Sequence, residues 1–540
     1  MDVKSAFAAL STRKVSTHTE AKARIVSEGS FSGSGRGGRK RGYNSFRNAN
    51  TQRSRFTLPE QSLDDLPAPD QLIAKKERPI EGLVDDYASS LSAEQKSVLE
   101  TVLKGYNVFF TGDAGTGKSH ILRVMIEALQ EQLGKDKVFV TASTGIAACN
   151  IGGITIHSFA GLGITNMDVN QTLRKVRQNE AAVERWKACQ VLIIDEISML
   201  DGRLFDMLEY VGRTVRNDST PFGGIQIVAC GDFFQLPPVG LGQHGVIFSF
   251  ESRWWNVVIE KVVVLKTVFR QKDMRLQRLL REVRYGRVSQ QSVHVIESMA
   301  SHDLEQVIAR QNCDEESDEE FHVESTKLFA LNNDVNRYNQ QKLDALDSPA
   351  VDYASIDNGV EESYLYQLGK SCQAPARLTL KLGAQVMLVK NLSVSDGLVN
   401  GCRGVVVSFT KKGEEAHPMP VVCFSTVKGE KRITMETVEF SVEAGGCVVA
   451  SRTQLPLKLA WGISIHKSQG MTIDLLDVDL RGVFEVGMTY VALSRGVSID
   501  RMRVTGFSLS GVKTNAKVVA FYTAISQGRR YVPYQQEKST

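Results

Sequence analysis

Glycine, lysine and serine crowd into one short stretch of the chain, TGDAGTGKSH at residues 111–120. Gly112 is followed, after four residues, by Gly-Lys-Ser at 117–119. Glycines at this spacing let the backbone curl so that successive N–H groups point at one anion, and the lysine and hydroxyl complete a phosphate site. An apolar strand is predicted before the stretch, and apolar side chains recur at a helical period after it. The stretch therefore predicts a P-loop that holds a nucleoside triphosphate, in preference to an ordinary glycine turn.

Each part of this loop has an expected role in holding the nucleotide. Lys118 is expected to reach the β- and γ-phosphates, and the hydroxyl of Ser119 to bind Mg²⁺. The positive end of the helix that follows adds to the field at the phosphates. The predicted nucleotide-binding residues of the loop are Gly112, Asp113, Ala114, Gly115, Thr116, Gly117, Lys118 and Ser119.

Two carboxylates follow a second apolar strand, which is predicted from VLIID at 191–195. A carboxylate at the carboxyl end of such a strand faces the crevice where α/β sheets bind ligands. Asp195 is expected to hold Mg²⁺ through water, and Glu196 to position or deprotonate the attacking water. Gln235 follows another apolar strand and has two open interpretations, a sensor of the γ-phosphate or a polar turn residue.

The elements that must position these residues follow from the pattern of apolar runs. Short apolar strands alternate with helical segments from about residue 91 to 250, which is typical of a parallel α/β domain. A second such region begins near 258. Residues 383–456 instead hold β-rich runs between glycine turns, and the α/β pattern then returns to about 526. The fold class is therefore α/β, with a small barrel-like insertion.

The bulk composition limits the remaining choices. A chain of 540 residues exceeds one hydrophobic core, and its 42% hydrophobic content is typical of a soluble globular protein. No apolar run reaches the roughly 18 residues that a membrane helix needs. The eight cysteines include no CxxC pair, which argues against a structural zinc site and a disulfide framework. We expect a reducing intracellular compartment and no membrane partner.

Basic residues concentrate at the amino terminus. Residues 1–57 hold twelve Lys or Arg and three acidic residues, although the whole chain carries a net charge of only +4. Their Ser- and Gly-rich composition predicts a disordered tail. The RGGRKRG run at 36–42 favours a nuclear localisation signal, with a mitochondrial transit peptide or a linker without an address as alternatives. The acidic run at 314–320 is interpreted as a solvated loop.

Taken in order, the motifs of this chain resemble those of the Pif (petite integration frequency) family of superfamily-one, B-type DNA helicases. The resemblance extends over about residues 88–508. The motifs that carry it are LSAEQ (91–95), GDAGTGKS (112–119), TASTGIAA (141–148), HSFAGLG (157–163), IIDEISML (193–200), GDFFQLPPV (231–239), VFRQ (268–271), HKSQGMT (466–472) and YVALSRG (490–496).

The resemblance implies an α/β fold of two RecA-like P-loop lobes, with a small wedge subdomain and an SH3-like β-barrel insertion. The implied boundaries are 1–87 for a disordered basic tail and linker, 88–257 for the first lobe with its wedge at 160–189, 258–382 and 457–526 for the second lobe, 383–456 for the insertion, and 527–540 for a C-terminal tail.

The resemblance also implies roles for residues outside the loop. Gln95 matches an adenine-reading motif, and Gln235 resembles a coupling glutamine. Arg270 and Arg495 resemble two arginines that reach the γ-phosphate from the second lobe, where a guanidinium stabilises charge on the transferring phosphoryl group. With ATP as substrate and Mg²⁺ as cofactor, the predicted catalytic residues are Lys118, Glu196, Gln235, Arg270 and Arg495.

Contacts with single-stranded DNA need donors to the backbone and stacking faces. The resemblance implies two clusters of such contacts. They are Thr144, His157, Ser158 and Phe159 in the first lobe, and His466, Lys467, Ser468, Gln469, Tyr490, Val491, Ser494 and Arg495 in the second. Core packing is an equal alternative for Phe159. A metal-binding role for His466 is not supported, because no second ligand stands at usable spacing.

The activity implied by the resemblance is ATP-dependent 5′→3′ movement on single-stranded DNA, with unwinding of duplex or structured DNA in genome maintenance (replication, repair, telomeres or mitochondrial DNA). Expected partners are single-stranded and forked DNA, with G-quadruplexes or RNA–DNA hybrids as further substrates, and a monomer in solution is expected. Rival interpretations are an RNA–DNA hybrid translocase, a catalytically weak DNA-binding scaffold and a clamp-loader-like ATPase. The presence of every predicted catalytic residue argues against the scaffold, and HKSQGMT and YVALSRG argue against the clamp loader.

Overall fold

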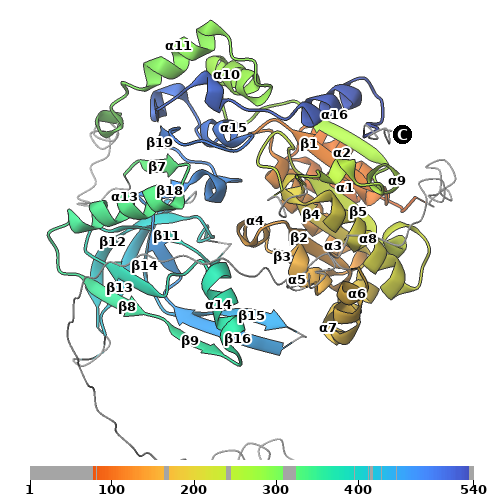
Figure 1. Cartoon of the computed structure of the whole chain (residues 1–540), viewed down its shortest axis with the longest axis horizontal. Helices are drawn as coiled ribbons and strands as arrows, with labels where there is room; N and C mark the ends of the chain where they lie inside the picture. Colours follow the sequence, from red (N-terminus) through yellow and green to blue (C-terminus); the bar gives the residue numbers. More distant parts are fainter. Residues whose placement is uncertain are drawn as a thin grey trace, which may run out of the picture. The chain divides into compact units, whose positions relative to one another are not determined.

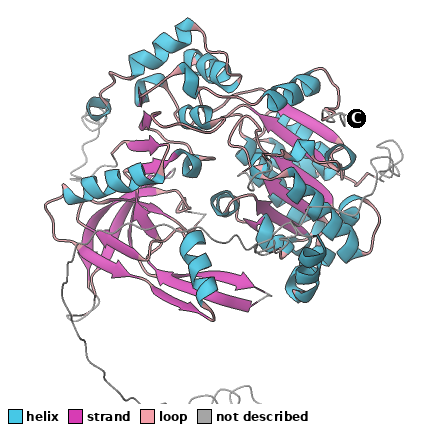
Figure 2. Ribbon diagram, viewed as in Figure 1, coloured by secondary structure: helices cyan, strands magenta, loops and turns pink. Residues whose placement is uncertain are grey.

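The computed structural model describes the chain from residue 77 to residue 533 with several short gaps (Figure 2). The described ranges are 77–80, 82–162, 169–238, 245–307, 324–393, 396–411, 413, 417–426, 429–444 and 447–533. The predicted basic tail at 1–57 and the acidic run at 314–320 lie outside these ranges. Within them, no helix is both long and apolar enough to cross a membrane.

The first sheet has six parallel strands in the order β3-β2-β4-β5-β1-β6 (Figure 1). Its central strands are buried at every residue, which fits their almost continuous apolar sequence. The strands are β1 (Val108–Gly112), β2 (Val138–Ala142), β3 (Ile154–Thr155), β4 (Val191–Asp195), β5 (Gln226–Cys230) and β6 (Lys261–Leu265). The P-loop follows β1 and the two predicted carboxylates stand at the end of β4, so both meet at the carboxyl edge of one sheet.

Helices before and between these strands set the position of the P-loop. The second of them begins with a capping box, in which Ser92 and Gln95 satisfy each other's backbone N–H groups. The helices are α1 (Leu83–Ala88), α2 (Ala93–Leu103), α3 (Lys118–Leu133), α4 (Gly145–Asn150), α5 (Ile156–Ala160), α6 (Val169–Gln178), α7 (Glu180–Ala188), α8 (Gly202–Arg216) and α9 (Trp255–Val258).

A second parallel sheet has the order β18-β7-β19-β20, so strands far apart in the sequence lie side by side. Its strands are β7 (Thr326–Phe329), β18 (Gly462–Ser464), β19 (Leu476–Asp479) and β20 (Met502–Thr505). Helices of this part of the chain are α10 (Met274–Arg284), α11 (Gln290–Met299), α13 (Asn332–Asp344), α15 (Met488–Leu493) and α16 (Ala516–Ser526). Two parallel sheets thus agree with the α/β class predicted from the alternating pattern.

The β-rich part of the chain forms antiparallel sheets that begin earlier than residue 383. One sheet has the order β14-β13-β12-β11-β17, another β15-β16-β9, and β8 pairs with β10. The strands are β8 (Val351–Ala354), β9 (Ile356–Gly359), β10 (Arg377–Leu380), β11 (Gln385–Leu388), β12 (Arg403–Thr410), β13 (Met419–Thr426), β14 (Gly429–Thr434), β15 (Val438–Ala444), β16 (Cys447–Gln454) and β17 (Leu457–Leu459), with α14 at Glu362–Ser371. Strand β9, which the implied boundaries gave to the second lobe, therefore completes a sheet with β15 and β16.

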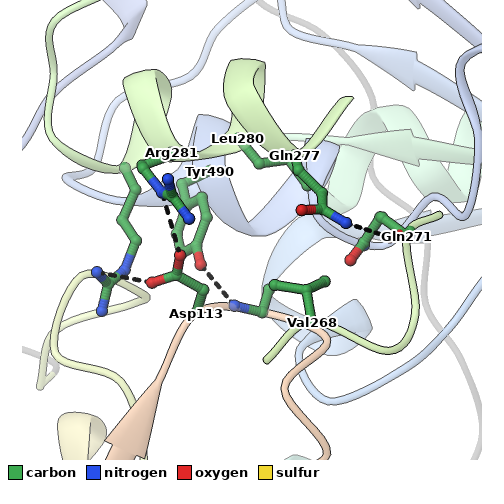
Figure 3. Close-up of a pocket in the computed structure, with 9 residues that line it drawn as sticks. Asp113, Val268, Gln271, Gln277, Leu280, Arg281 and Tyr490 are labelled. Carbon is green, nitrogen blue, oxygen red and sulfur yellow. Dashed lines mark hydrogen bonds and ion pairs between the residues drawn. The ribbon is translucent and has the colours of Figure 1, made fainter. Parts of the chain in front are cut away.

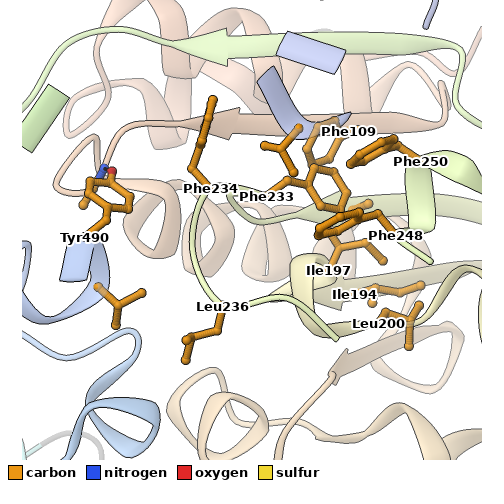
Figure 4. Packing of buried hydrophobic residues seen from close by; sticks show 14 of the residues in the cluster. Phe109, Ile194, Ile197, Leu200, Phe233, Phe234, Leu236, Phe248, Phe250 and Tyr490 are labelled. Atoms are coloured by element: carbon orange, nitrogen blue, oxygen red, sulfur yellow. Dashed lines mark hydrogen bonds between the residues drawn. The ribbon is translucent and has the colours of Figure 1, made fainter. Parts of the chain in front are cut away.

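Aromatic side chains fill the core beside the first sheet (Figure 4). The ring of Phe233 packs edge-on against that of Phe250 at 4.8 Å and lies 5.4 Å from that of Phe109. Phe521 of α16 stacks on Phe250 with ring centroids 4.3 Å apart. The last described helix of the chain therefore packs into the core of the first sheet.

Candidate functional site

The P-loop adopts a backbone that only glycine accommodates easily. Gly115 and Gly117 have φ angles of 87° and 77°, in the left-handed region. A Cβ atom at Gly112 would lie 2.5 Å from the carbonyl oxygen of Leu265, so β1 can approach β6 closely there only without a side chain. The predicted turn from strand to helix is confirmed by β1 and α3.

The lysine and serine of the loop stand in the first turn of α3. Lys118 Nζ donates to the carbonyl oxygens of Gly112 and Asp113, at 2.9 and 3.0 Å. Ser119 is exposed in the first turn of α3. The amine thus lies over the loop's own backbone, within the curl that a phosphate would enter.

Gln95 braces the P-loop from α2. Its side chain is buried, accepts a hydrogen bond from the backbone N–H of Ser92 at 3.0 Å, and donates to the carbonyl oxygen of Thr116 at 3.4 Å. The amide is thus placed beside the nucleotide-binding loop. Its reading of adenine stays a prediction.

Asp195 and Glu196 stand at the end of β4 with unlike environments. Asp195 is buried and accepts a hydrogen bond from the backbone N–H of Glu196 at 2.9 Å. Burial, with the neighbouring charge of Glu196, raises the pKa of Asp195 to about 7. Glu196 has a φ angle of 50°, an uncommon backbone conformation for a residue with a side chain and one that often marks a functional site.

Gln469 of the HKSQG motif reaches this carboxylate. Its Nε2 donates to Glu196 Oε2 at 2.9 Å, across 273 residues of sequence. Gln469 was predicted to contact DNA, but its side-chain amide contacts the carboxylate predicted to activate water. A residue from the second parallel-sheet region therefore meets the phosphate-facing edge of the first sheet.

Arg270 and Arg495 meet around Ser494. Arg270 Nη1 donates to the carbonyl oxygen of Ser494 at 3.0 Å, and Arg495 Nη2 donates to its hydroxyl at 2.8 Å. Burial lowers the pKa of both arginines, and for Arg495, which also feels the charge of Arg270, the pKa falls to about 9. In the part of the chain that the structure describes, neither guanidinium pairs with a carboxylate. A buried cation, Arg495, and a half-buried one, Arg270, without an acidic partner fit an anionic ligand.

Segments distant in sequence also hold the tip of the P-loop (Figure 3). The backbone N–H groups of Phe269 and Arg270 donate to the carbonyl oxygen of Gly115, at 2.8 and 3.2 Å. The hydroxyl of Tyr490 accepts a hydrogen bond from the backbone N–H of Ala114 at 2.8 Å. The predicted arginine segment and the YVALSRG motif therefore lie against the loop.

This donor set fits a nucleoside triphosphate. The curled loop with its lysine, together with Arg270 and Arg495, whose hydrogen bonds go to neutral acceptors, suits a polyphosphate. A hydroxyl and a carboxylate, those of Ser119 and Asp195, suit a magnesium ion that keeps most of its water and shares phosphate oxygens. Gln235 is buried four residues after the sheet edge at Gly231, and its role as sensor stays a prediction.

The first predicted DNA-contact cluster divides between surface and core. His157 and Ser158 are exposed on α5, and the hydroxyl of Thr144 accepts from the backbone N–H of Ala147, which caps α4. Phe159 is fully buried, with its ring 4.9 Å from that of Trp186. The ring of Phe159 therefore offers no face to a DNA base, and its alternative interpretation as a core residue agrees with the structure.

The second cluster is mostly buried as well. Lys467 is exposed, and His466 Nε2 lies 2.8 Å from Glu485 Oε2. Buried members of the predicted cluster are Ser468, Gln469, Tyr490, Val491, Ser494 and Arg495. Their side chains are buried in this structure, and direct DNA contact by them stays a prediction. Lys467 and, in part, His466 remain accessible.

Comparison with known proteins decides the family. The family model "PIF1-like helicase" matches residues 90–292, and the model "DNA helicase Pif1, 2B domain" matches residues 363–409. The crystal structure of Pif1 helicase from Candida albicans is 40% identical in sequence, covers 81% of this chain and is itself covered to 99%, with a TM-score of 0.72. The chain belongs to the PIF1-like helicase family.

Relatives of this chain include two vertebrate proteins named ATP-dependent DNA helicase PIF1. Those from Homo sapiens and Danio rerio are each 41% identical, over 81% and 83% of this chain. The chain spans 64% and 66% of their lengths. Bacteroides Pif1 in complex with ADP-AlF3 and ssDNA is 26% identical to this chain, with a TM-score of 0.59. The match covers 81% of this chain and 97% of the Bacteroides chain.

Sequence reasoning missed one buried group in this chain. Asp232, Arg284 and Tyr522 form a hydrogen-bonded cluster behind the P-loop. Their separations of 52 and 290 residues match no local motif spacing. The sequence held one signal for this cluster, two charged residues to which no role was assigned. One is an aspartate that follows an apolar strand, and the other is an arginine on the apolar side of a helix.

Proposed function

We propose that this chain is an ATP-dependent DNA helicase whose ATP hydrolysis is stimulated by DNA. The observation that carries the proposal is the hydrogen bond from Gln469 to Glu196. It joins the HKSQG motif, which also presents the exposed Lys467, to the carboxylate expected to activate water. A strand that displaces this motif would change the setting of the catalytic carboxylate, which is the coupling that a motor requires.

The chemistry follows from the residues around the P-loop. Lys118, Arg270 and Arg495 supply positive charge where the transferring phosphoryl group develops negative charge. Glu196 orients or deprotonates the attacking water. Ser119 and Asp195 would hold Mg²⁺, which when bound neutralises charge on the β- and γ-phosphates.

The DNA substrates are proposed from the printed descriptions of relatives. Solved Pif1 structures include one bound to ssDNA, and another described as a basis for DNA unwinding at forked dsDNA by two coordinating Pif1 helicases. We propose single-stranded and forked DNA for this chain, with 5′→3′ movement and a role in genome maintenance. We also propose G-quadruplexes and RNA–DNA hybrids as further substrates. The protein is proposed to be a monomer in solution and to reside in the nucleus.

The proposed architecture assigns mechanical roles to two segments. Helices α6 and α7 would form the wedge that separates strands, and β11–β14 with β17 would form the SH3-like barrel. Two RecA-like lobes, centred on the two parallel sheets, would open and close around ATP. Support comes from the family and from the antiparallel order of these five strands.

Unwinding of forked duplexes tests this proposal directly. With ATP and Mg²⁺, the chain is expected to unwind a fork that offers a 5′ single-stranded tail and to leave a fork with only a 3′ tail paired. Lys118→Ala should lose hydrolysis and unwinding, because the phosphates lose their lysine. The measurement is strand release with fluorescent oligonucleotides, beside ATP hydrolysis with and without ssDNA.

Three outcomes of that experiment contradict the proposal or part of it. Unwinding from the 3′ tail would overturn the polarity. Hydrolysis with DNA stimulation but no unwinding of any fork would indicate a translocase or remodeller. Absence of hydrolysis in the unmodified chain would favour the DNA-binding scaffold.

A further inference from the structure

Arg284, the last residue of α10, holds two carboxylates at once. Its Nη2 and Nε donate to the carboxylate of Asp232, at 2.9 and 3.3 Å, and its Nη1 lies 2.9 Å from Asp113 Oδ1. The side chain of Arg284 is only 3% exposed and that of Asp232 is fully buried. Asp113 is 27% exposed, so the arginine joins an interior charge to one at the edge of the loop.

Aromatic rings enclose the guanidinium. Its carbon lies 4.3 Å from the ring centroid of Phe234 and 4.9 Å from that of Tyr522. The hydroxyl of Tyr522 also bonds to Thr111 Oγ1 at 2.7 Å and to Asp232 at 3.2 Å. Burial alone would lower the pKa of Arg284, but Asp232, Tyr490 and Asp113 raise it above its ordinary value, so the cation persists.

The two carboxylates belong to different parts of the nucleotide site. Asp113 is the second residue of the P-loop, two positions before Gly115. Asp232 is the second residue of the GDFFQ segment, three positions before Gln235, the predicted sensor. Arg284 therefore fixes the distance between the loop that holds the phosphates and the segment expected to report their hydrolysis.

Packing alone does not fix the side chain of Asp113. It is 27% exposed and borders a small pocket lined also by Val268, Gln277 and Tyr490 (Figure 3). In the described residues, Oε1 of the buried Gln271, on the same pocket, has no hydrogen-bond partner. Because Asp113 is partly exposed, its ion pair with Arg284 at 2.9 Å is the stronger directional contact of this side chain.

A natural control lies one turn earlier on the same helix. Arg281 faces the same carboxylate, but its Nε is 3.8 Å from Asp113 Oδ2 and its side chain is 63% exposed (Figure 3). Such an exposed pair contributes little. The two arginines share charge and helix, and they differ in burial and in contact with Asp232.

We propose that Arg284 is a positioning residue for ATP turnover, which acts by tying the P-loop through Asp113 to the Gln235 segment through Asp232. This inference rests on the proposed ATP hydrolysis. It assigns a function to an arginine that lies outside every motif named above. In this proposal the ion pair with Asp232 anchors Arg284, and the ion pair with Asp113 transmits the position of Arg284 to the P-loop.

The test is steady-state ATP hydrolysis by the full chain with saturating ssDNA. Asp113→Asn cuts the link at the loop and leaves the buried Arg284–Asp232 pair intact, so the variant should fold. Its kcat is expected to fall about tenfold to a hundredfold while KM for ATP changes less than threefold, since a misplaced reacting group slows turnover more than it weakens binding. Arg284→Lys, which keeps the charge without the fork, should show the same pattern.

The double variant Asp113→Asn/Arg284→Lys separates this role from independent effects. If Asp113 acts through Arg284, its kcat should be no lower than that of the worse single variant. Multiplied losses would overturn the inference, as would a raised KM with unchanged kcat, or wild-type kcat in both single variants. Arg281→Gln should match the unmodified chain, and a loss equal to that of Arg284→Lys would show that general charge matters instead. An unmodified chain without hydrolysis would instead contradict the proposed function.

Discussion

At the scale of single residues, the contact between Gln469 and Glu196 departs most from expectation. The sequence assigned the glutamine to DNA and the glutamate to catalysis, and the structure brings their side chains to 2.9 Å. A neutral amide that donates to a carboxylate orients it without quenching its charge. Gln469 therefore contacts the carboxylate that is predicted to activate water.

Substitution of this glutamine should separate hydrolysis from its stimulation. In Gln469→Ala, DNA-stimulated kcat is expected to fall about tenfold, because one hydrogen bond to a charged group contributes about 1.5–3 kcal/mol. Binding of ssDNA without nucleotide should change little, because the amide faces inward. The measurement is ATP hydrolysis over a range of ssDNA concentrations, and an unchanged maximal rate would contradict this role.

Substitutions of Phe159 and Lys467 are expected to have opposite effects on stability and on ssDNA binding. Phe159→Ala should lower the melting temperature, because truncation of a buried phenylalanine costs about 3–5 kcal/mol. Lys467→Ala should leave the melting temperature unchanged, weaken ssDNA binding and reduce its salt dependence by about one phosphate contact. Thermal unfolding and ssDNA titrations at several salt concentrations check both. A stable Phe159→Ala variant with weakened ssDNA binding would restore the stacking interpretation.

At the scale of elements, local patterns predicted well and distant pairings did not. The P-loop, α3 and the central strands of the first sheet were predictable because glycine spacing and apolar runs act within a few residues. Nothing local marks the partner of β9 or the packing site of α16. The pairing of Arg284 with Asp232 could not be predicted either, since the fold brings the two residues together and no spacing in the sequence identifies a buried ion pair.

The packing of α16 gives a prediction at this scale. Phe521→Ala should destabilise the first sheet by about 3–5 kcal/mol, because its ring lies among Phe109, Phe233, Phe250 and Trp255. Val532→Ala, at a residue that is 76% exposed, is the matched control and should unfold like the unmodified chain. Thermal unfolding provides the measurement, and equal melting temperatures for the two variants would contradict the packing role of α16.

At the scale of the whole molecule, parts of the chain distant in sequence converge on the P-loop and its neighbouring carboxylate. Tyr490, Arg284 and Gln469 bring contacts from α15, α10 and the HKSQG motif. ATP and DNA can influence each other through such contacts, because each ligand favours the arrangement that it fits better. The buried Tyr490 of the YVALSRG motif thus contacts the loop that is predicted to hold the nucleotide.

Loss of the Tyr490 hydroxyl tests this view. Tyr490→Phe keeps the buried ring and removes the acceptor for the Ala114 N–H, so kcat should fall severalfold while the ssDNA dissociation constant stays within about twofold. Fluorescence anisotropy with labelled oligonucleotides and ATP hydrolysis report the two quantities. A large rise in the ssDNA dissociation constant with normal turnover would contradict this view and support the predicted contact of Tyr490 with DNA.

Strand β9 also limits how this molecule can be divided and recombined. It pairs with β16 from Ile356 to Gly359, although some ninety residues separate the two strands. Removal of residues 383–456 would leave β9 as an unpaired edge and expose its backbone groups to other chains. An exchange between relatives would therefore have to carry residues 351–459 as one unit. The modular boundary of the insertion is set by strand pairing and not by the change in sequence composition.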